Sequence, residues 1–304
     1  MTPVPPLTNA YSRLLEELAD KKKYAVRTVY EHYVVKKGLP DPNRITVVLR
    51  IDVDSCFHLA FPLAEWIHYY GLTATHYFLT HPGRYYSLWD SNIPKKIYEL
   101  GQEVGLHTDH YYEQLVFNKN GLAELKADII KLGQLVGEPI KGMVYHGHPD
   151  IDSLGVTNWD LTAGLASSDL GLEYHDGLKS VYIAPGATSW RPKCDHRISD
   201  FMGFPYSWGW NYLPFYPGFM LKLYGRKGKT FHIAFHAKNA FEYWKYWTSK
   251  YHEQPIARES LEVFWKKRVL IFYRYFIAPI WQKPVVGVVR FLGIEGKVRR
   301  WLKR

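Results

Sequence analysis

Short apolar runs alternate with amphipathic segments along the chain, and this alternation constrains the fold more than any other feature of the sequence. Four runs in the first half predict strands, at 45–51, 73–79, 103–107 and 141–146. Three periodic segments between them predict helices, at 58–70, 93–101 and 121–136. Strands separated by helices of about 10–15 residues indicate parallel βαβ units. We therefore expect an α/β fold, either a barrel or a doubly wound sheet.

The segment before the first of these strands has a helical pattern of its own. Leucines at helical spacing among charged residues predict a helix over 8–36, and the turn-forming residues Gly38 and Pro40 end it. We expect an N-terminal helical extension at 1–44, followed by an α/β domain at 45–257.

The C-terminal segment 258–304 carries most of the charge of the chain. It holds twelve Lys and Arg against three Glu, a net charge of +9 out of +10 for the whole chain. Apolar and aromatic residues interleave with the basic ones, and the run 269–281 is too short and too charged to span a membrane. This pattern is typical of an amphipathic segment on an anionic membrane surface, although a helix packed on its own domain with a basic outer face fits it too. The nearly neutral remainder does not predict binding to nucleic acid.

The cysteines and the N-terminus set the expected compartment. Cys56 and Cys194 are the two cysteines of the chain and lack CxxC spacing, so we expect no disulfide and no zinc or redox motif. The first fifteen residues have no basic start followed by an apolar core, which is the pattern of a signal peptide. We expect a cytoplasmic protein associated peripherally with the inner face of the membrane.

Two aspartates follow the apolar run 45–51, in the sequence Asp52-Val53-Asp54. Because side chains alternate along a strand, Asp52 and Asp54 face the same side and Val53 faces the other. Two carboxylates at a strand end can divide the work of one site, since one can bind a cation while the other accepts a proton. A pair of solvated acids at the start of a loop fits the same pattern, so a functional site requires further groups beside them.

Histidines follow a second predicted strand. His107 ends the run 103–107, and His110 comes three residues later. If 108–112 turns into a helix, residues three apart lie on one face and both imidazoles can bind one cation. With Asp54 from a neighbouring strand, these histidines predict a divalent metal site.

Three motifs in this order resemble the polysaccharide deacetylase family, carbohydrate esterase family 4. The phrases Leu-Arg-Ile-Asp-Val-Asp at 49–54 and Glu-Val-Gly-Leu-His at 103–107 look like its first two motifs. Phe-His-Ala at 235–237, where a predicted strand 230–236 ends, resembles its last. The resemblance is nearest to the branch that contains the bacterial deformylase of undecaprenyl-phosphate-linked formamido-arabinose.

The resemblance implies a distorted (β/α) barrel and a hydrolase of linear amide bonds. Such an enzyme removes an acetyl or formyl group from an amino sugar with one divalent metal, Zn²⁺ being favoured and Mn²⁺, Co²⁺ or Ni²⁺ being alternatives. Matched position by position, Asp52 corresponds to the general base, Asp54 and His107 to metal ligands, and His236 to the general acid. The implied partner is an amino-sugar glycan of the cell surface, and with the basic segment 258–304 a lipid-linked intermediate of cell-envelope or lipopolysaccharide synthesis.

The sequence departs from the family at two places. The family spaces its metal histidines four residues apart, but that position is Tyr111 here, which leaves His110 as the available ligand. The third motif of the family supplies an arginine that orients the base, whereas the predicted strand 141–146 ends in His146 and continues to His148. Either histidine can be a third ligand or a substrate contact, and Arg191 is the candidate replacement for the arginine.

Two other functions fit parts of the sequence. An Asp-x-Asp motif also holds Mn²⁺ or Mg²⁺ against a diphosphate in nucleotide-sugar glycosyltransferases, although only 51 residues precede Asp52 here. A catalytically altered, carbohydrate-binding protein of the same fold fits the changed third motif. The remaining histidines are expected to be structural, although His232 shares a strand face with His236.

Overall fold

The computed structural model describes residues 7, 9–54, 56–80, 88–147, 151, 155–177, 180–183, 190–192, 195–199, 221 and 225–241. The chain divides into two units, Met1–Glu253 and Gln254–Arg304, and every described residue belongs to the first. The basic segment 258–304 lies outside the described residues, so its boundary and its membrane role remain predictions. Among the described residues, no helix is long and apolar enough to cross a membrane.

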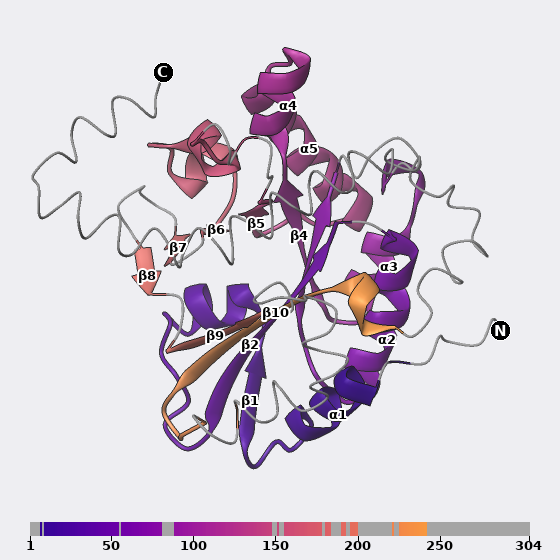
Figure 1. Ribbon diagram of the computed structural model, residues 1–304, viewed down its shortest axis with the longest axis vertical. Helices are drawn as coiled ribbons and strands as arrows, with labels where there is room; N and C mark the ends of the chain where they lie inside the picture. The colour runs from indigo at the N-terminus through magenta and orange to yellow at the C-terminus, as the bar shows by residue number, and fades with distance from the viewer. Residues whose placement is uncertain are drawn as a thin grey trace, which may run out of the picture. The chain divides into compact units, whose positions relative to one another are not determined.

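One curled sheet organises the described part of the chain (Figure 1). Its strands are β1 (Tyr24–Arg27), β2 (Ile45–Val53), β3 (Thr75–Leu79), β4 (Glu103–Thr108), β5 (Gly142–Tyr145), β6 (Tyr174–Asp176), β7 (Ser180–Ile183), β8 (Trp190–Pro192), β9 (His196–Ser199) and β10 (Thr230–His236). They are ordered β8-β7-β6-β5-β4-β3-β2-β10-β9, with β1 paired to β2. Neighbouring strands are parallel throughout the run β6-β5-β4-β3-β2-β10-β9. The pairs β6–β7 and β7–β8 are antiparallel. The described strands form a half-barrel.

Strand β2 is an interior strand of this sheet and is buried along its whole length. β10 pairs with it over Thr46–Asp52. On its other edge, β1 pairs with the first half of β2 and β3 with the second half. A strand covered on both faces reads as a continuous apolar run, which is the pattern of 45–51.

Helices cover the outer face of the sheet. The longer ones are α1 (Asn9–Leu18), α2 (Ala60–Tyr69), α3 (Ile93–Glu99), α4 (His110–Phe117) and α5 (Gly121–Val136). Figure 1 shows α2 and α3 side by side next to the strands. The outer residues of β2, Val47, Leu49 and Ile51, belong to the same apolar core as the buried residues of α1, α2, α3 and α5. At α5 the Asn120 side chain accepts a hydrogen bond from the Ala123 amide, and Gly137 ends the helix at φ 94°.

The inner face of the sheet has a smaller core built around two tyrosines. Tyr77 and Tyr174 are fully buried there, with their hydroxyl groups 2.7 Å apart. Gly105 and Gly142 make room for these rings, because a Cβ at Gly105 would overlap Tyr77 and one at Gly142 would overlap Tyr174. Buried side chains therefore fill the inner face of the sheet. The polar residues lie beyond them, at the carboxyl ends of the strands.

Most elements agree with the sequence-based expectations. The five predicted strands of the α/β domain and its three predicted helices are confirmed, each to within two residues at either end. The predicted helix over 8–36 is wrong. Only Asn9–Leu18 is α-helical, while Tyr24–Arg27 forms β1 and Glu31–Val35 forms a short π-helical turn, η1. Parallel pairing of β1 with the start of β2 overrides the helical spacing in that stretch.

Candidate metal centre

Four strands of the sheet bring polar side chains to one edge. Asp52 and Asp54 come from the end of β2, His107 from β4, His146 from the residue after β5, and His236 from the last position of β10. These strands are parallel, so their carboxyl ends meet at the same edge, where ligands bind in α/β folds. The register puts His236 beside Asp52, and the His146 amide continues the β4–β5 pairing by donating to the Thr108 carbonyl at 2.9 Å.

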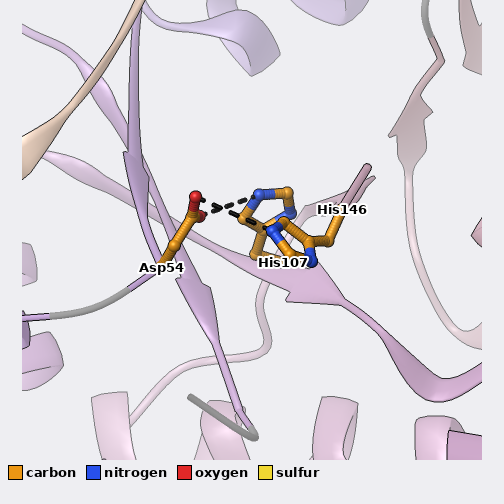
Figure 2. Close-up of side chains that lie close together, drawn as sticks. All are labelled: Asp54, His107 and His146. Atoms are coloured by element: carbon orange, nitrogen blue, oxygen red, sulfur yellow. Dashed lines mark ion pairs between the residues drawn. The ribbon is translucent and has the colours of Figure 1, made fainter. Parts of the chain in front are cut away.

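The Asp54 carboxylate is the centre of this cluster. Its Oδ1 lies 3.1 Å from His107 Nε2, and its Oδ2 lies 3.0 Å from His236 Nε2 and 3.8 Å from His146 Nε2. Figure 2 shows the rings of His107 and His146 directed at the carboxylate. Among the described residues, one group of ligand atoms, from Asp54, His107 and His146, lies within 4.8 Å of one another. His236 reaches the same carboxylate but is not part of this group.

Each histidine of this group has an oxygen atom facing the ring nitrogen that points away from Asp54. His107 Nδ1 lies 3.3 Å from the Val144 carbonyl, and His146 Nδ1 lies 3.5 Å from Asp109 Oδ2. A metal-binding histidine commonly donates its second ring N–H to a carbonyl or carboxylate, which leaves the other nitrogen free to ligate. Here both acceptors face Nδ1, and both Nε2 atoms face Asp54. One carboxylate and two imidazoles suit Zn²⁺, Co²⁺ or Ni²⁺ better than Mg²⁺, so the residues fit the expected divalent ion.

The electrostatics of the cluster favour an ionised Asp54. Burial raises the pKa of the Asp54 carboxyl, but the facing His236 and His107 outweigh this and hold that pKa well below its usual value. For His146, burial lowers the pKa, and the Asp109 and Asp54 carboxylates outweigh it, so its pKa is raised.

Both carboxylate oxygens of Asp52 are bonded to an arginine of the same strand. Arg50 Nε donates to Asp52 Oδ1 at 2.6 Å and Arg50 Nη2 donates to Asp52 Oδ2 at 2.7 Å. The remaining nitrogen of the guanidinium, Nη1, donates to Asp176 Oδ2 at 3.1 Å. The guanidinium carbon lies 5.4 Å from the centre of the Tyr77 ring. Burial raises the pKa of Asp52, but the charges of Arg50 and His107 together with the hydrogen bonds from Arg50 outweigh burial, so this pKa is lowered. Asp52 is therefore a fixed carboxylate beside the cluster.

The structure does not bring His110 into the cluster, which corrects its expected place as a metal ligand. His110 Nε2 lies 3.1 Å from Asp128 Oδ2, and His110 Nδ1 lies 2.9 Å from the Thr108 hydroxyl. The reason is local. His107 still belongs to β4 and His110 is the first residue of α4, so the helical rule for residues three apart does not apply to the pair. His146, from the next strand, takes the third position.

The other predicted site residues lie elsewhere or beyond the described part. His148 lies outside the described residues. The backbone of Arg191 belongs to β8, where it pairs with Val181, and its side chain is outside the description. His232 lies on the inner face, as alternation predicts, with Nδ1 3.5 Å from the Tyr33 hydroxyl.

Sequence reasoning missed Arg50. A signal for it was present, since the alternation that places Asp52 and Asp54 on one face also places Arg50 there, and an arginine inside an apolar strand requires a partner. The roles of Asp109, Asn158 and Asp176 had no comparable local signal, because their contacts join residues far apart in the sequence.

Comparisons with known proteins add little to this geometry. No family model and no curated protein matches the chain. One solved structure that matches is a family 4 carbohydrate esterase from Bacillus anthracis, at 11% identity and a TM-score of 0.36, covering 72% of this chain and 76% of that one. A likeness this weak decides neither the fold nor the activity of this chain.

Proposed function

We propose that this chain is a divalent-metal-dependent hydrolase that removes an N-acyl group, acetyl or formyl, from an amino sugar. The observation that carries the proposal is the convergence of Asp54, His107 and His146 at one edge of the sheet, beside a second carboxylate, Asp52, that an arginine holds in place. Amide hydrolysis needs these parts: a Lewis acid, a base for the water and an acid for the leaving amine.

Each residue of the cluster has a role in that reaction. Asp54, His107 and His146 would hold the cation, which when bound polarises the amide carbonyl of the substrate. Asp52 accepts the proton of the attacking water, and the two bonds from Arg50 keep its carboxylate pointed in one direction. His236 gives a proton to the leaving amine from Nε2, which Asp54 Oδ2 orients at 3.0 Å.

The ligand set argues against the glycosyltransferase alternative. A cation that bridges a diphosphate is normally Mg²⁺ or Mn²⁺ and prefers oxygen ligands. Here two of the three grouped ligands are imidazoles, and both oxygens of Asp52 accept hydrogen bonds from Arg50. Asp54 is thus the member of the Asp-x-Asp pair that faces the histidines.

The substrate class rests on the sequence. The phrases at 49–54, 103–107 and 235–237 support a sugar deacetylase or deformylase, and the net charge of +9 in 258–304 supports a substrate at an anionic membrane surface. A lipid-linked amino-sugar glycan made at the inner face of the membrane meets both conditions.

The activity can be tested by release of acetate or formate. Purified protein, stripped with a chelator and reloaded with Zn²⁺ or Co²⁺, is incubated with N-acetylated chitooligosaccharides and with N-formyl amino-sugar glycosides. We expect metal-dependent hydrolysis of one class, and a loss of about 10²–10⁴-fold in Asp52→Asn. Exposed His68 on α2 provides a matched control, and His68→Gln should keep full activity. Absence of hydrolysis of every N-acyl amino sugar by the metal-loaded protein would refute the proposal.

A further inference from the structure

The side of His146 that faces away from Asp54 contacts an unusual arrangement of two polar residues. Asp109 is the residue that precedes α4, a position where an aspartate side chain commonly caps the helix. Its carboxylate makes no capping hydrogen bond. Instead Oδ2 faces His146 Nδ1 at 3.5 Å, and Oδ1 accepts a hydrogen bond of 2.6 Å from Asn158 Nδ2. Asp109 is 6% exposed, and its carboxylate is directed at the histidine rather than at the helix.

Asn158, the first residue of the short 3₁₀ helix η4 (Asn158–Thr162), fixes both Asp109 and His146. Its Nδ2 donates to Asp109 Oδ1 and also to the His146 carbonyl at 2.8 Å, while its Oδ1 accepts from the Tyr112 amide at 3.0 Å. Asn158 is 1% exposed, so water does not compete for these bonds. One amide group thereby joins the start of α4 to the end of β5, the two segments that meet at the cluster.

We infer that Asp109 and Asn158 form a clamp that positions His146 as a metal ligand, an inference that rests on the proposed function for its cation. The Asp109 carboxylate, with Oδ2 3.5 Å from His146 Nδ1, favours the tautomer that carries its proton on Nδ1, which leaves Nε2 without a proton and directed at the cation position beside Asp54. Asn158 sets the orientation of the Asp109 carboxylate and of the His146 backbone. Both residues act through His146 and contact neither cation nor substrate.

The substitution Asp109→Asn tests this clamp without a change in side-chain size. If the new amide oxygen faces Asn158, its NH₂ group faces His146 Nδ1, which must then accept, and the ring proton moves to Nε2. If the amide is turned round, two NH₂ groups face each other. The first arrangement opposes ligation by Nε2, as an aspartate-to-asparagine change does when it selects the wrong histidine tautomer. The second loses the hydrogen bond from Asn158 that orients the side chain at 109.

A second buried aspartate–histidine pair provides the matched control. Asp128 on α5 lies 3.1 Å from His110 Nε2, outside the cluster, so Asp128→Asn breaks a pair of the same kind without touching His146. Co²⁺ affinity is measured by competition with a chelating dye, and the visible absorption of bound Co²⁺ reports its ligands. We expect Asp109→Asn and Asn158→Ala to bind Co²⁺ about 10–100-fold more weakly than the wild-type protein, with altered absorption bands. Asp128→Asn should match the wild type in both.

Urea unfolding of the metal-free variants separates positioning from stability, because Asp109→Asn and Asp128→Asn should unfold at similar midpoints. Wild-type Co²⁺ affinity and spectrum in Asp109→Asn, or an equal loss in Asp128→Asn, would overturn the clamp. If the wild type binds Co²⁺ and Asp109→Asn weakens it, but no N-acyl amino sugar is hydrolysed, the proposed function fails and the clamp stands. A wild-type protein that binds no Co²⁺ refutes both.

Discussion

Arg50 donates hydrogen bonds to both carboxylate oxygens of Asp52, two residues further along the same strand. The same guanidinium also binds the buried Asp176, so its planar group is held at three positions. Arg50 thus lies beside Asp52, the proposed base, where the resemblance to the deacetylases led us to expect an arginine from a third motif. The missing motif does not by itself imply an inactive protein.

Substitution of Arg50 by lysine should separate catalysis from metal binding. Lysine keeps the charge but cannot bind both oxygens of Asp52 in fixed geometry. We expect kcat for amide hydrolysis to fall about 10–100-fold, because a small displacement of the base costs this much. Zn²⁺ affinity should not change, because the guanidinium of Arg50 is bonded to Asp52 and Asp176 and not to the three grouped ligands.

Arg44 offers a control for this variant. It binds Asp41 through Nε at 3.1 Å and Nη2 at 2.7 Å, near the opposite end of β2. Arg44→Lys should leave kcat unchanged. A similar loss in both variants, or a loss of Zn²⁺ binding in Arg50→Lys, would contradict a positioning role for Arg50.

Buried histidines away from the cluster should make the fold sensitive to mild acid. Burial lowers the pKa of His76 to about 3, and burial with the charge of Arg27 lowers the pKa of His32 to about 4. In the unfolded chain each histidine binds a proton near pH 6.5. Below that pH the unfolded state binds more protons than the folded state, so the free energy of unfolding falls as the pH drops from about 6.5 towards these values.

His76→Leu should remove its share of this pH dependence. His76 lies in β3, fully buried, and neither ring nitrogen has a hydrogen-bond partner in the described part of the chain. Between pH 7.5 and pH 5 the wild-type protein should lose about 2 kcal/mol more stability than the variant, measured by urea unfolding. The exposed His68 is the control, and His68→Leu should follow the wild type. Equal losses in His76→Leu and the wild type would show that His76 is not buried as a neutral ring.

The basic segment 258–304 should bind anionic membranes. Each basic residue near an anionic leaflet adds up to about 1 kcal/mol, and this segment carries a net charge of +9. We expect the full chain to sediment with phosphatidylserine vesicles at low salt and to be released at high salt, while a chain ending at residue 257 stays in solution. Unchanged vesicle binding by the shortened chain would remove the membrane proposal and leave the metal centre unaffected.

The sequence predicted the positions that depend on one strand better than those that depend on contacts between segments. Strand alternation placed Asp52 and Asp54 together, and strand ends placed His107 and His236 at the same edge. The third histidine depended on whether the residues after His107 were already helical, and local spacing favoured His110. The helix begins only at His110, and the β4–β5 pairing brings His146 to the cluster instead.

Longer-range contacts could not be read from the sequence. Asn158 reaches Asp109 across 49 positions, and Asp176 reaches Arg50 across 126. Tyr24–Arg27 was predicted as helix because its pairing with β2, which decides its conformation, involves residues about 20 positions further along the chain.

Zn²⁺ stoichiometry in two histidine variants tests the central claim most directly. The wild-type protein should bind about one Zn²⁺ per chain, measured by elemental analysis after chelator treatment and reloading. His146→Gln should lose this ion, and His110→Gln should retain it, because His146 faces Asp54 whereas His110 is bonded to Asp128 and Thr108. Retention of Zn²⁺ by His146→Gln together with its loss from His110→Gln, or a wild-type protein that binds no Zn²⁺, would contradict the metal centre described here.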